Sequence, residues 1–223
     1  MKGKIKVILV DDHAVVRAGF RLLLASVDTI EVIAEAERGE AACQFYLEKQ
    51  PDVMVLDLSM PGIGGLETIR RICNRDSNAK ILVFSVHDEA VYVHRAMNAG
   101  AKGYVTKSTA PVILALAIQK IAEGGTYIED GLTSETLAQN NGTASRAIID
   151  CLTPREFDVF LLLAKGLTVH KAAEELCLGY KTVANYGTQI KNKLNVSTVA
   201  ELAHIAMGLG AKGQCYALHN AVS

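Results

Sequence analysis

Tryptophan is absent from this chain of 223 residues, proline occurs four times, and aromatic residues make up only 5% of the sequence. The five cysteines are an odd number with no short repeated spacing, which argues against a zinc site or a disulfide framework. We expect them to be small buried apolar side chains in a reducing compartment. No apolar run reaches membrane-spanning length, and the first is too short for a secretory signal. The sequence therefore predicts a soluble, cytoplasmic protein with no membrane association.

The chain also has no large excess of positive or negative charge, because it contains 23 basic and 24 acidic residues. The whole chain is therefore not a polycation that coats nucleic acid or anionic lipid, although a small DNA-binding module is still possible. A hydrophobic content of 50% with 21% charged residues is typical of globular proteins. The length is comfortable for two small domains.

The first 123 residues alternate short apolar runs with helical patterns. The runs predict strands at Ile5–Val10, Ile30–Ala34, Val53–Leu58, Ile81–Ser85 and Gly103–Thr106. Helical spacing fills the gaps at Ala14–Ser26, Glu40–Lys49, Leu66–Cys73, Glu89–Ala99 and Pro111–Glu123. Strands this apolar need cover on both faces, so we expect an α/β domain with a five-stranded, doubly wound parallel sheet.

After Glu123 the pattern changes. Gly124 to Ile128 reads as a turn with a short extended piece, Thr133–Ala138 as a possible brief helix, and 139–145 as a polar linker. Thr153-Pro154-Arg155-Glu156 then has the residues of a capping box and opens a small all-α domain of four helices. We expect domains at 1–123 and 151–208, a linker at 124–150 and a C-terminal tail at 209–223, for which we have no interpretation.

Acidic side chains follow the predicted strands at one edge of the sheet. Asp11 and Asp12 come directly after the first strand, and Asp57 lies at the end of the third. Carboxyl ends of parallel strands share one crevice, and three carboxylates there repel one another unless a cation compensates. Oxygen ligands favour Mg²⁺ over a transition metal. Taken alone, Asp12 is more simply explained as a helix cap.

A lysine and a hydroxyl complete this edge. Lys107 follows the fifth strand and Ser85 ends the fourth. A metal and a lysine can neutralise phosphoryl oxygens while a carboxylate attacks phosphorus. A lone lysine is usually solvated, but five suitable groups at the ends of four strands make coincidence a poor explanation.

These residues resemble the receiver domain of two-component response regulators, which has a flavodoxin-like fold. The resemblance covers about the first 123 residues and rests on Leu9-Val10-Asp11-Asp12-His13, Asp57-Leu58-Ser59-Met60-Pro61 with Gly65, Ser85, and Gly100 to Lys107. It implies that Asp57 accepts phosphate from a sensor histidine kinase. It also implies that Mg²⁺ is held by Asp11, Asp12, Asp57 and the backbone carbonyl of Ser59. Ser85 and Lys107 would then contact the phosphoryl group, and Tyr104 would be the aromatic switch.

Simpler interpretations exist for some of these residues. Tyr104 alone is more often a half-buried strand aromatic. His13 and His87 flank the site without ligand spacing, and we expect both to be solvated. The glycine-rich stretch from Gly62 to Gly65 is expected to be a mobile loop through which a kinase approaches Asp57.

A second resemblance rests on Leu152 to Glu156, Leu161 to Thr168, Ala172 to Leu176, Lys181 to Asn185, Ile190 to Val196 and Glu201 to Ala203. This segment resembles the LuxR/NarL-type helix-turn-helix, which implies that the helix Tyr180–Leu194 enters the major groove. The expected DNA-binding residues are Lys181, Thr182, Ala184, Asn185, Thr188, Gln189, Lys191 and Lys193, with phosphate contacts also from Lys165 and Lys171. This helix departs from the family pattern because it carries few basic residues, has Tyr186 where a histidine is usual, and contains Gly187, which costs roughly 1 kcal/mol against alanine. Asn185 and Gln189 can still each bind adenine. Lys191 and Lys193 could instead be an ordinary solvated face.

The sequence thus predicts a response regulator of the NarL/FixJ type, which binds promoter DNA and is not an enzyme. We expect a homodimer when it is phosphorylated, with Val199, Leu202, Ala203 and Met207 as a dimer surface or, equally, as core. One alternative is a phospho-switch that acts through protein contacts because its helix-turn-helix has lost base readout. Another is an enzyme, either a small phosphatase or a flavodoxin-like cofactor binder.

Overall fold

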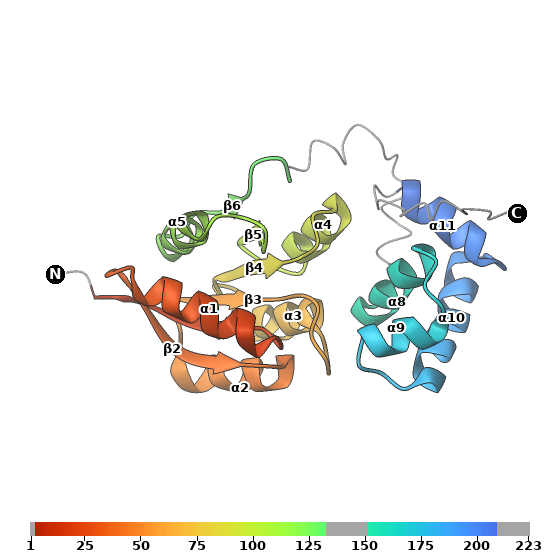
Figure 1. Ribbon diagram of the computed structural model, residues 1–223, viewed down its shortest axis with the longest axis horizontal. Coiled ribbons are helices and arrows are strands. Elements are labelled where there is room, and N and C mark those ends of the chain that lie inside the picture. The colour runs from red at the N-terminus through yellow and green to blue at the C-terminus, as the bar shows by residue number, and fades with distance from the viewer. Residues whose placement is uncertain (1–2, 133–150, 209–223) are drawn as a thin grey trace, which may run out of the picture.

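The computed structural model describes residues 3–132 and 151–208, and the first of these stretches forms an α/β domain (Figure 1). Strands alternate with helices as the hydrophobic pattern predicts. The elements are β1 (Ile5–Val10), α1 (Ala14–Ala25), β2 (Ile30–Ala36), α2 (Gly39–Lys49), β3 (Val53–Leu56), α3 (Gly65–Arg75), β4 (Ile81–Ser85), α4 (Ala90–Asn98), β5 (Gly103–Thr106), α5 (Pro111–Ala122) and β6 (Tyr127–Ile128).

The strands form one parallel sheet in the order β2-β1-β3-β4-β5-β6. Successive side chains of a strand point to opposite faces, and β1 shows the result. Val7 and Leu9 pack with α1 and α5, whereas Ile8 and Val10 pack with α2, α3 and α4. Both faces are covered, which explains why the strands are almost continuously apolar.

The sheet has one strand more than the five that we expected. Tyr127 and Ile128, predicted only as a short extended piece, pair in parallel with Gly103 and Tyr104 of β5. Without this pairing the outer side of β5 would present unpaired backbone groups. The additional strand is only two residues long, and a pattern that short carries no periodicity from which it could be predicted.

The second described stretch is the expected small helical domain. It contains α8 (Pro154–Ala164), α9 (Val169–Glu175), α10 (Tyr180–Leu194) and α11 (Val199–Gly208). The predicted capping box is present, since Thr153 Oγ1 accepts from Glu156 N at 3.3 Å and Glu156 Oε2 accepts from Thr153 N at 2.7 Å. Phe157, Phe160 and Leu161 of α8 are all buried.

The prediction of buried cysteines was wrong for part of the set. Cys43 and Cys73 are half-buried, but Cys151 and Cys177 are exposed, because both lie in connections at helix ends rather than on packed faces. The expected brief helix at 133–138 and the C-terminal tail lie outside the described residues. Among the residues that are described, no helix is both long and apolar enough to cross a membrane.

The two domains touch through α8, which contacts α3 and, through Phe157, Tyr92 of α4. Figure 1 shows α8 on the side of the helical domain that faces the first domain. The contact has an aromatic centre, where the rings of Tyr92 and Phe157 meet edge to face with centroids 5.6 Å apart. The guanidinium of Arg95 lies 4.1 Å from the centre of the Phe157 ring. Both rings are buried, so the docked arrangement removes substantial apolar surface from water.

Candidate functional site

The predicted acidic residues do meet at the carboxyl edge of the sheet. Asp11 follows β1, and Asp57 follows β3, where its backbone N–H bonds to the carbonyl of Val10 at 2.9 Å. The start of α3 presses against this turn. A Cβ added to Gly65 would lie 2.4 Å from the carbonyl oxygen of Asp57 and 2.5 Å from Leu58 Cα, so only glycine fits there.

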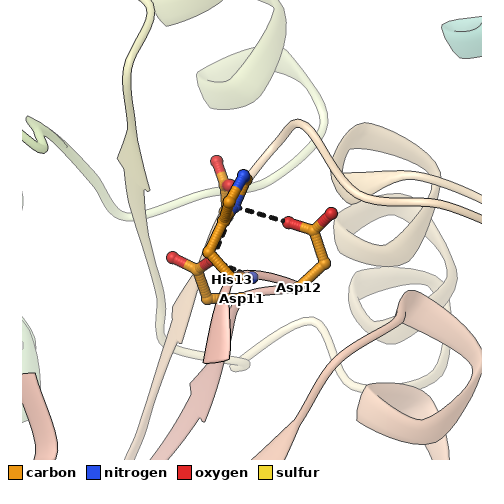
Figure 2. A group of neighbouring side chains, drawn as sticks. Asp11, Asp12 and His13 are labelled. Atoms are coloured by element: carbon orange, nitrogen blue, oxygen red, sulfur yellow. Dashed lines mark hydrogen bonds and ion pairs between the residues drawn. The ribbon is translucent and has the colours of Figure 1, made fainter. Parts of the chain in front are cut away.

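The carboxylates form a cluster that could hold a metal ion (Figure 2). Four possible ligand atoms lie within 4.8 Å of one another, one from each of Asp11, Asp12, His13 and Asp57. Asp12 Oδ1 is buried and accepts no hydrogen bond from the described part of the chain, although His13 Nδ1 lies 2.9 Å away. A buried oxygen without a hydrogen bond is costly unless a cation or water satisfies it. The donor set therefore fits a hard divalent cation.

His13 is only partly as expected. Its side chain is 62% exposed, yet Nδ1 lies between Asp11 Oδ1, at 3.2 Å, and Asp12 Oδ1. The backbone N–H of His13 also donates to Asp11 Oδ1 at 2.9 Å. The sequence indicated no role for this histidine because its carboxylate partners are its immediate neighbours, which form no recognisable ligand spacing.

Lys107 joins two of the acids. Its ammonium lies 2.6 Å from Asp11 Oδ2 and 2.7 Å from Asp57 Oδ2, and only 10% of the side chain is exposed. Burial lowers the pKa of Lys107, but Asp57 and Asp11 outweigh it and raise the pKa above its ordinary value. The lysine is thus held charged at the edge where the acids converge.

Asp57 has the least exposed carboxylate of this cluster. Its side chain is 2% exposed, and burial raises its pKa while Lys107 opposes that rise. The backbone N–H of Ser59 donates to Asp57 Oδ1 at 3.3 Å. The ammonium of Lys107 supplies positive charge beside Asp57, and the neighbouring acidic cluster could hold a cation. The Asp57 carboxylate is therefore placed to bond an electrophile that carries negatively charged oxygens.

Ser85 and Tyr104 lie beside this cluster and are both fully buried. Burial raises the pKa of Tyr104, and its hydroxyl donates to the carbonyl of His87 at 2.9 Å. The expectation of a solvated His87 was wrong. Its ring stacks on Tyr92 with centroids 3.9 Å apart, and Nε2 lies 2.8 Å from Ser59 Oγ. The histidine therefore connects the acidic edge to the helix that meets the second domain.

Polar contacts across the domain interface involve residues that the sequence analysis missed or assigned elsewhere. Arg155 donates through Nε to the carbonyl of Gly62, at 3.0 Å, and through Nη2 to that of Met60, at 2.9 Å, both in the loop after Asp57. Lys165 Nζ lies 2.7 Å from Glu89 Oε1, so the lysine expected to meet phosphates faces the first domain. Burial raises the pKa of Glu89, but contacts with His87 and Lys165 lower it to about 2. No sequence pattern marks pairs whose partners are 76 or more residues apart.

The face of α10 that we expected to read DNA is open to solvent. Lys181, Thr182, Asn185, Thr188 and Gln189 are exposed, Ala184 and Lys191 are half-exposed, and Val183, Gly187 and Ile190 form the buried side. Lys193 differs, because its ammonium lies 2.7 Å from Glu156 Oε2, a carboxylate that is 4% exposed. In α11, Leu202 is core, whereas Val199 and Met207 are 43% and 59% exposed.

The fold and its acidic edge define a receiver domain, which is joined here to a helix-turn-helix. Residues 7–119 match the family model described as "Response regulator receiver domain", and residues 150–206 match that of "Bacterial regulatory proteins, luxR family". The transcriptional activator protein ExaE of Pseudomonas putida is 39% identical over 206 residues, which are 92% of this chain and 96% of that protein. The response regulator UvrY of Escherichia coli K12 is 37% identical over 92% of this chain and 95% of its own length.

Solved structures agree with this assignment. A structure described as two RcsB dimers bound to two parallel DNAs has a TM-score of 0.58 and 25% identity, and covers 92% of this chain and 99% of its own. The chain belongs to the response regulators with a LuxR-type helix-turn-helix, the NarL/FixJ group that the motifs indicated. It is a DNA-binding transcription regulator under phosphorylation control rather than an enzyme. The alternative in which the helix-turn-helix has lost base readout is not favoured.

Proposed function

We propose that Asp57 is the residue that accepts the phosphoryl group, and that a sensor histidine kinase is its donor. The observation that carries the proposal is the convergence on Asp57 of one ammonium and two further carboxylates at the end of a buried strand. When a carboxylate oxygen bonds phosphorus, the donor's leaving group departs and negative oxygens gather on the new group. Lys107, released from sharing between two carboxylates, can pair with one of those oxygens.

Mg²⁺ is the cation that this site would hold in our proposal. Asp11, Asp12, Asp57 and the backbone carbonyl of Ser59 are its expected protein ligands. Bound there, the ion would supply charge neutralisation for the phosphoryl oxygens. The three carboxylates, and the oxygen of Asp12 that accepts no hydrogen bond from the described part of the chain, support a hard cation.

The response to phosphorylation would pass from Ser85 to the second domain. In our proposal Ser85 moves to the phosphoryl oxygen and Tyr104 repacks, a two-state change biased by new charge. Repacking Tyr104 breaks its bond to the His87 carbonyl, and the His87 ring stacks on Tyr92, which touches Phe157 of α8. This contiguous path is the physical basis for coupling Asp57 to the DNA-binding domain.

Promoter DNA is the proposed target of α10. Its expected contacts are Lys181, Thr182, Ala184, Asn185, Thr188, Gln189 and Lys191, with Lys193 secondary because of its ion pair. Most of this face is exposed in the docked arrangement, so we infer that phosphorylation acts by pairing two copies on half-sites rather than by uncovering the helix. Apolar side chains offer surface for that homodimer on α11 (Val199, Met207), α1 (Val15, Leu22) and α5 (Val112, Leu116).

The test is treatment of the full chain with a small phosphodonor and Mg²⁺, followed by intact-mass measurement, light scattering and mobility shift on a random DNA pool. We expect one phosphoryl group per chain, a mass in solution that doubles, and enrichment of a paired sequence motif. Asp57→Asn should abolish uptake, while Asp28→Asn, an exposed aspartate in the α1–β2 loop, should leave it unchanged. Uptake that persists in Asp57→Asn would contradict the assignment of the acceptor.

The domain limits and the location remain part of this proposal. We place the receiver at 1–123, the linker at 124–150, the helix-turn-helix at 151–208 and the tail at 209–223, in the cytoplasm. The family matches at 7–119 and 150–206 support the two domains.

A further inference from the structure

The sixth strand brings the start of the interdomain connection against the strand that carries the switch residue. Tyr127 N donates to the carbonyl of Lys102 at 3.1 Å, and Glu129 N donates to the carbonyl of Tyr104 at 3.0 Å. In a regular parallel ladder, the next bond would run from Thr106 N to the backbone carbonyl of Glu129. That bond is not made, because the chain turns and the Glu129 carbonyl accepts instead from Leu132 N at 3.1 Å.

The side chain of Glu129 replaces the missing carbonyl. Its Oε2 accepts from Thr106 N at 2.7 Å and from Thr106 Oγ1 at 2.9 Å. Thr106 is only 6% exposed, so without Glu129 its backbone N–H would lose this partner in a largely dry position. Its hydroxyl would keep the contact with Ser108 Oγ at 2.9 Å. Bonds to a carboxylate are shorter and stronger than bonds to a neutral carbonyl, and they hold this strand end more firmly.

Thr106 immediately precedes Lys107, and the backbone of Lys107 is held on its other side. Lys107 N donates to the carbonyl of Ser85 at 2.8 Å, which ties it to β4. The Lys107 side chain extends from this point so that its ammonium lies 2.6 Å from Asp11 Oδ2 and 2.7 Å from Asp57 Oδ2. A small shift of the strand end would move it away from both, and charge placement at a reacting centre is sensitive to such shifts.

We propose that Glu129 is a positioning residue for phosphoryl transfer, which holds Thr106 so that Lys107 faces Asp57 and which ties the beginning of the interdomain connection to the Tyr104 strand. The inference rests on the proposed role of Asp57 as acceptor. In this proposal Glu129 couples the receiver sheet to the start of the interdomain connection. Movement of β5 after phosphorylation must then move residues 127–132 as well, independently of the contacts made by α8.

The test compares rates of phosphate uptake from a small donor by the full chain carrying Glu129→Met, Glu129→Gln or Thr106→Val. Methionine keeps the length of the side chain but accepts hydrogen bonds poorly, and we expect phosphate uptake to slow by roughly tenfold to a hundredfold. Glutamine keeps an acceptor oxygen and should stay within about threefold of wild type. Thr106→Val removes one of the two bonds, keeps the β-branched shape and should give an intermediate rate.

A double-mutant cycle with Lys107→Gln separates positioning from general support of the fold. If Glu129 acts through Lys107, Glu129→Met should slow the Lys107→Gln chain no further. An equal slowing in both backgrounds, or a wild-type rate in Glu129→Met, would overturn the inference. Should Glu129→Met fail to fold by circular dichroism, Thr106→Val in the same two backgrounds decides. Failure of the proposed function gives a different result, since uptake would then persist in Asp57→Asn or be absent from wild type.

Discussion

The acidic edge of the receiver and the exposed face of α10 handle charge in opposite ways. At the edge, Asp11 and Asp57 are 6% and 2% exposed and share the ammonium of Lys107. On α10, Lys181, Asn185 and Gln189 point into solvent. Buried partners fix one another's geometry, so a single substitution there removes the whole arrangement. Exposed groups contribute separately, by small amounts that depend on salt.

This difference explains how so neutral a helix can serve a DNA-binding protein. Asn185 and Gln189 can pair with adenine edges without adding charge, and few lysines are left for phosphates. Affinity per domain should be modest, with a shallow salt dependence, and pairing of two domains restores it through avidity. If the proposed homodimer forms on phosphorylation, we expect specificity to depend on its two half-sites.

The largest effect should come from Gly65→Ala at the acidic edge. The new Cβ would meet the backbone of Asp57 and Leu58 at 2.4 and 2.5 Å, and backbone cannot move aside as a side chain can. We expect a loss of about 3 kcal/mol of unfolding free energy, measured by urea titration, together with impaired phosphate uptake. Gly19→Ala is the matched control, because nothing lies within 4 Å of its added Cβ. A Gly65→Ala chain with the unfolding free energy of wild type would show that the turn is not tightly packed.

The two lysines near the end of α10 should behave differently. Lys193→Met strips the buried Glu156 of its cation and should cost about 1–2 kcal/mol of stability in thermal melts. Lys191→Met should change stability by less than about 0.5 kcal/mol but lower the slope of log affinity against log salt by about 1. If Lys193→Met instead altered the salt slope at wild-type stability, Lys193 would belong to the DNA-binding face.

Acidification should tighten the contact between the domains. Burial raises the pKa of Asp158, on α8, to about 6 against opposition from Arg155 and Arg95, compared with 3.8 for a solvated group. The docked state therefore holds the proton more tightly, and its advantage is full below pH 4 and is lost as pH rises through about 6. Small-angle X-ray scattering should show a more compact chain at pH 5 than at pH 7.

The variant Asp158→Asn controls for other groups at this interface. His87 and Glu89 face the same contact from the receiver, so the variant separates the effect of Asp158 from that of its neighbours. If Asp158 is responsible, the variant should show little change between pH 5 and pH 7. An unchanged pH response in Asp158→Asn would assign it to these neighbours.

The smallest effect, and of opposite sign to Gly65→Ala, is expected from Gly187→Ala. A Cβ at position 187 would meet only the end of the Leu163 side chain, at 3.4 Å, which can adjust. Alanine favours the helix by up to about 1 kcal/mol over glycine, so we expect a net gain of about 0.5 kcal/mol in unfolding free energy. A loss of stability would mean that α8 and α10 need glycine for their close approach.

Local patterns were enough to predict most of the fold and the membership of the acidic edge. The apolar runs located five strands, and the position of Asp11, Asp57, Ser85 and Lys107 at strand ends brought them to one edge. Interdomain contacts could not be predicted in this way. His87 looked solvated because its contact with Ser59 arises only when the loops after β3 and β4 meet, and because stacking on Tyr92 depends on how α4 packs after its loop.

The sequence by itself determined the two kinds of domain, the capping box at Thr153 and the acidic cluster, since each follows from spacing within a strand or a helix turn. Only the tertiary structure decided that Lys193 and Lys165 face carboxylates rather than phosphates, that Arg155 holds the loop after Asp57, and that Glu129 completes β5. These contacts form where folding brings charged side chains next to hydrogen-bonding groups of distant segments that need a partner. That is a property of the whole fold, and no segment carries it alone.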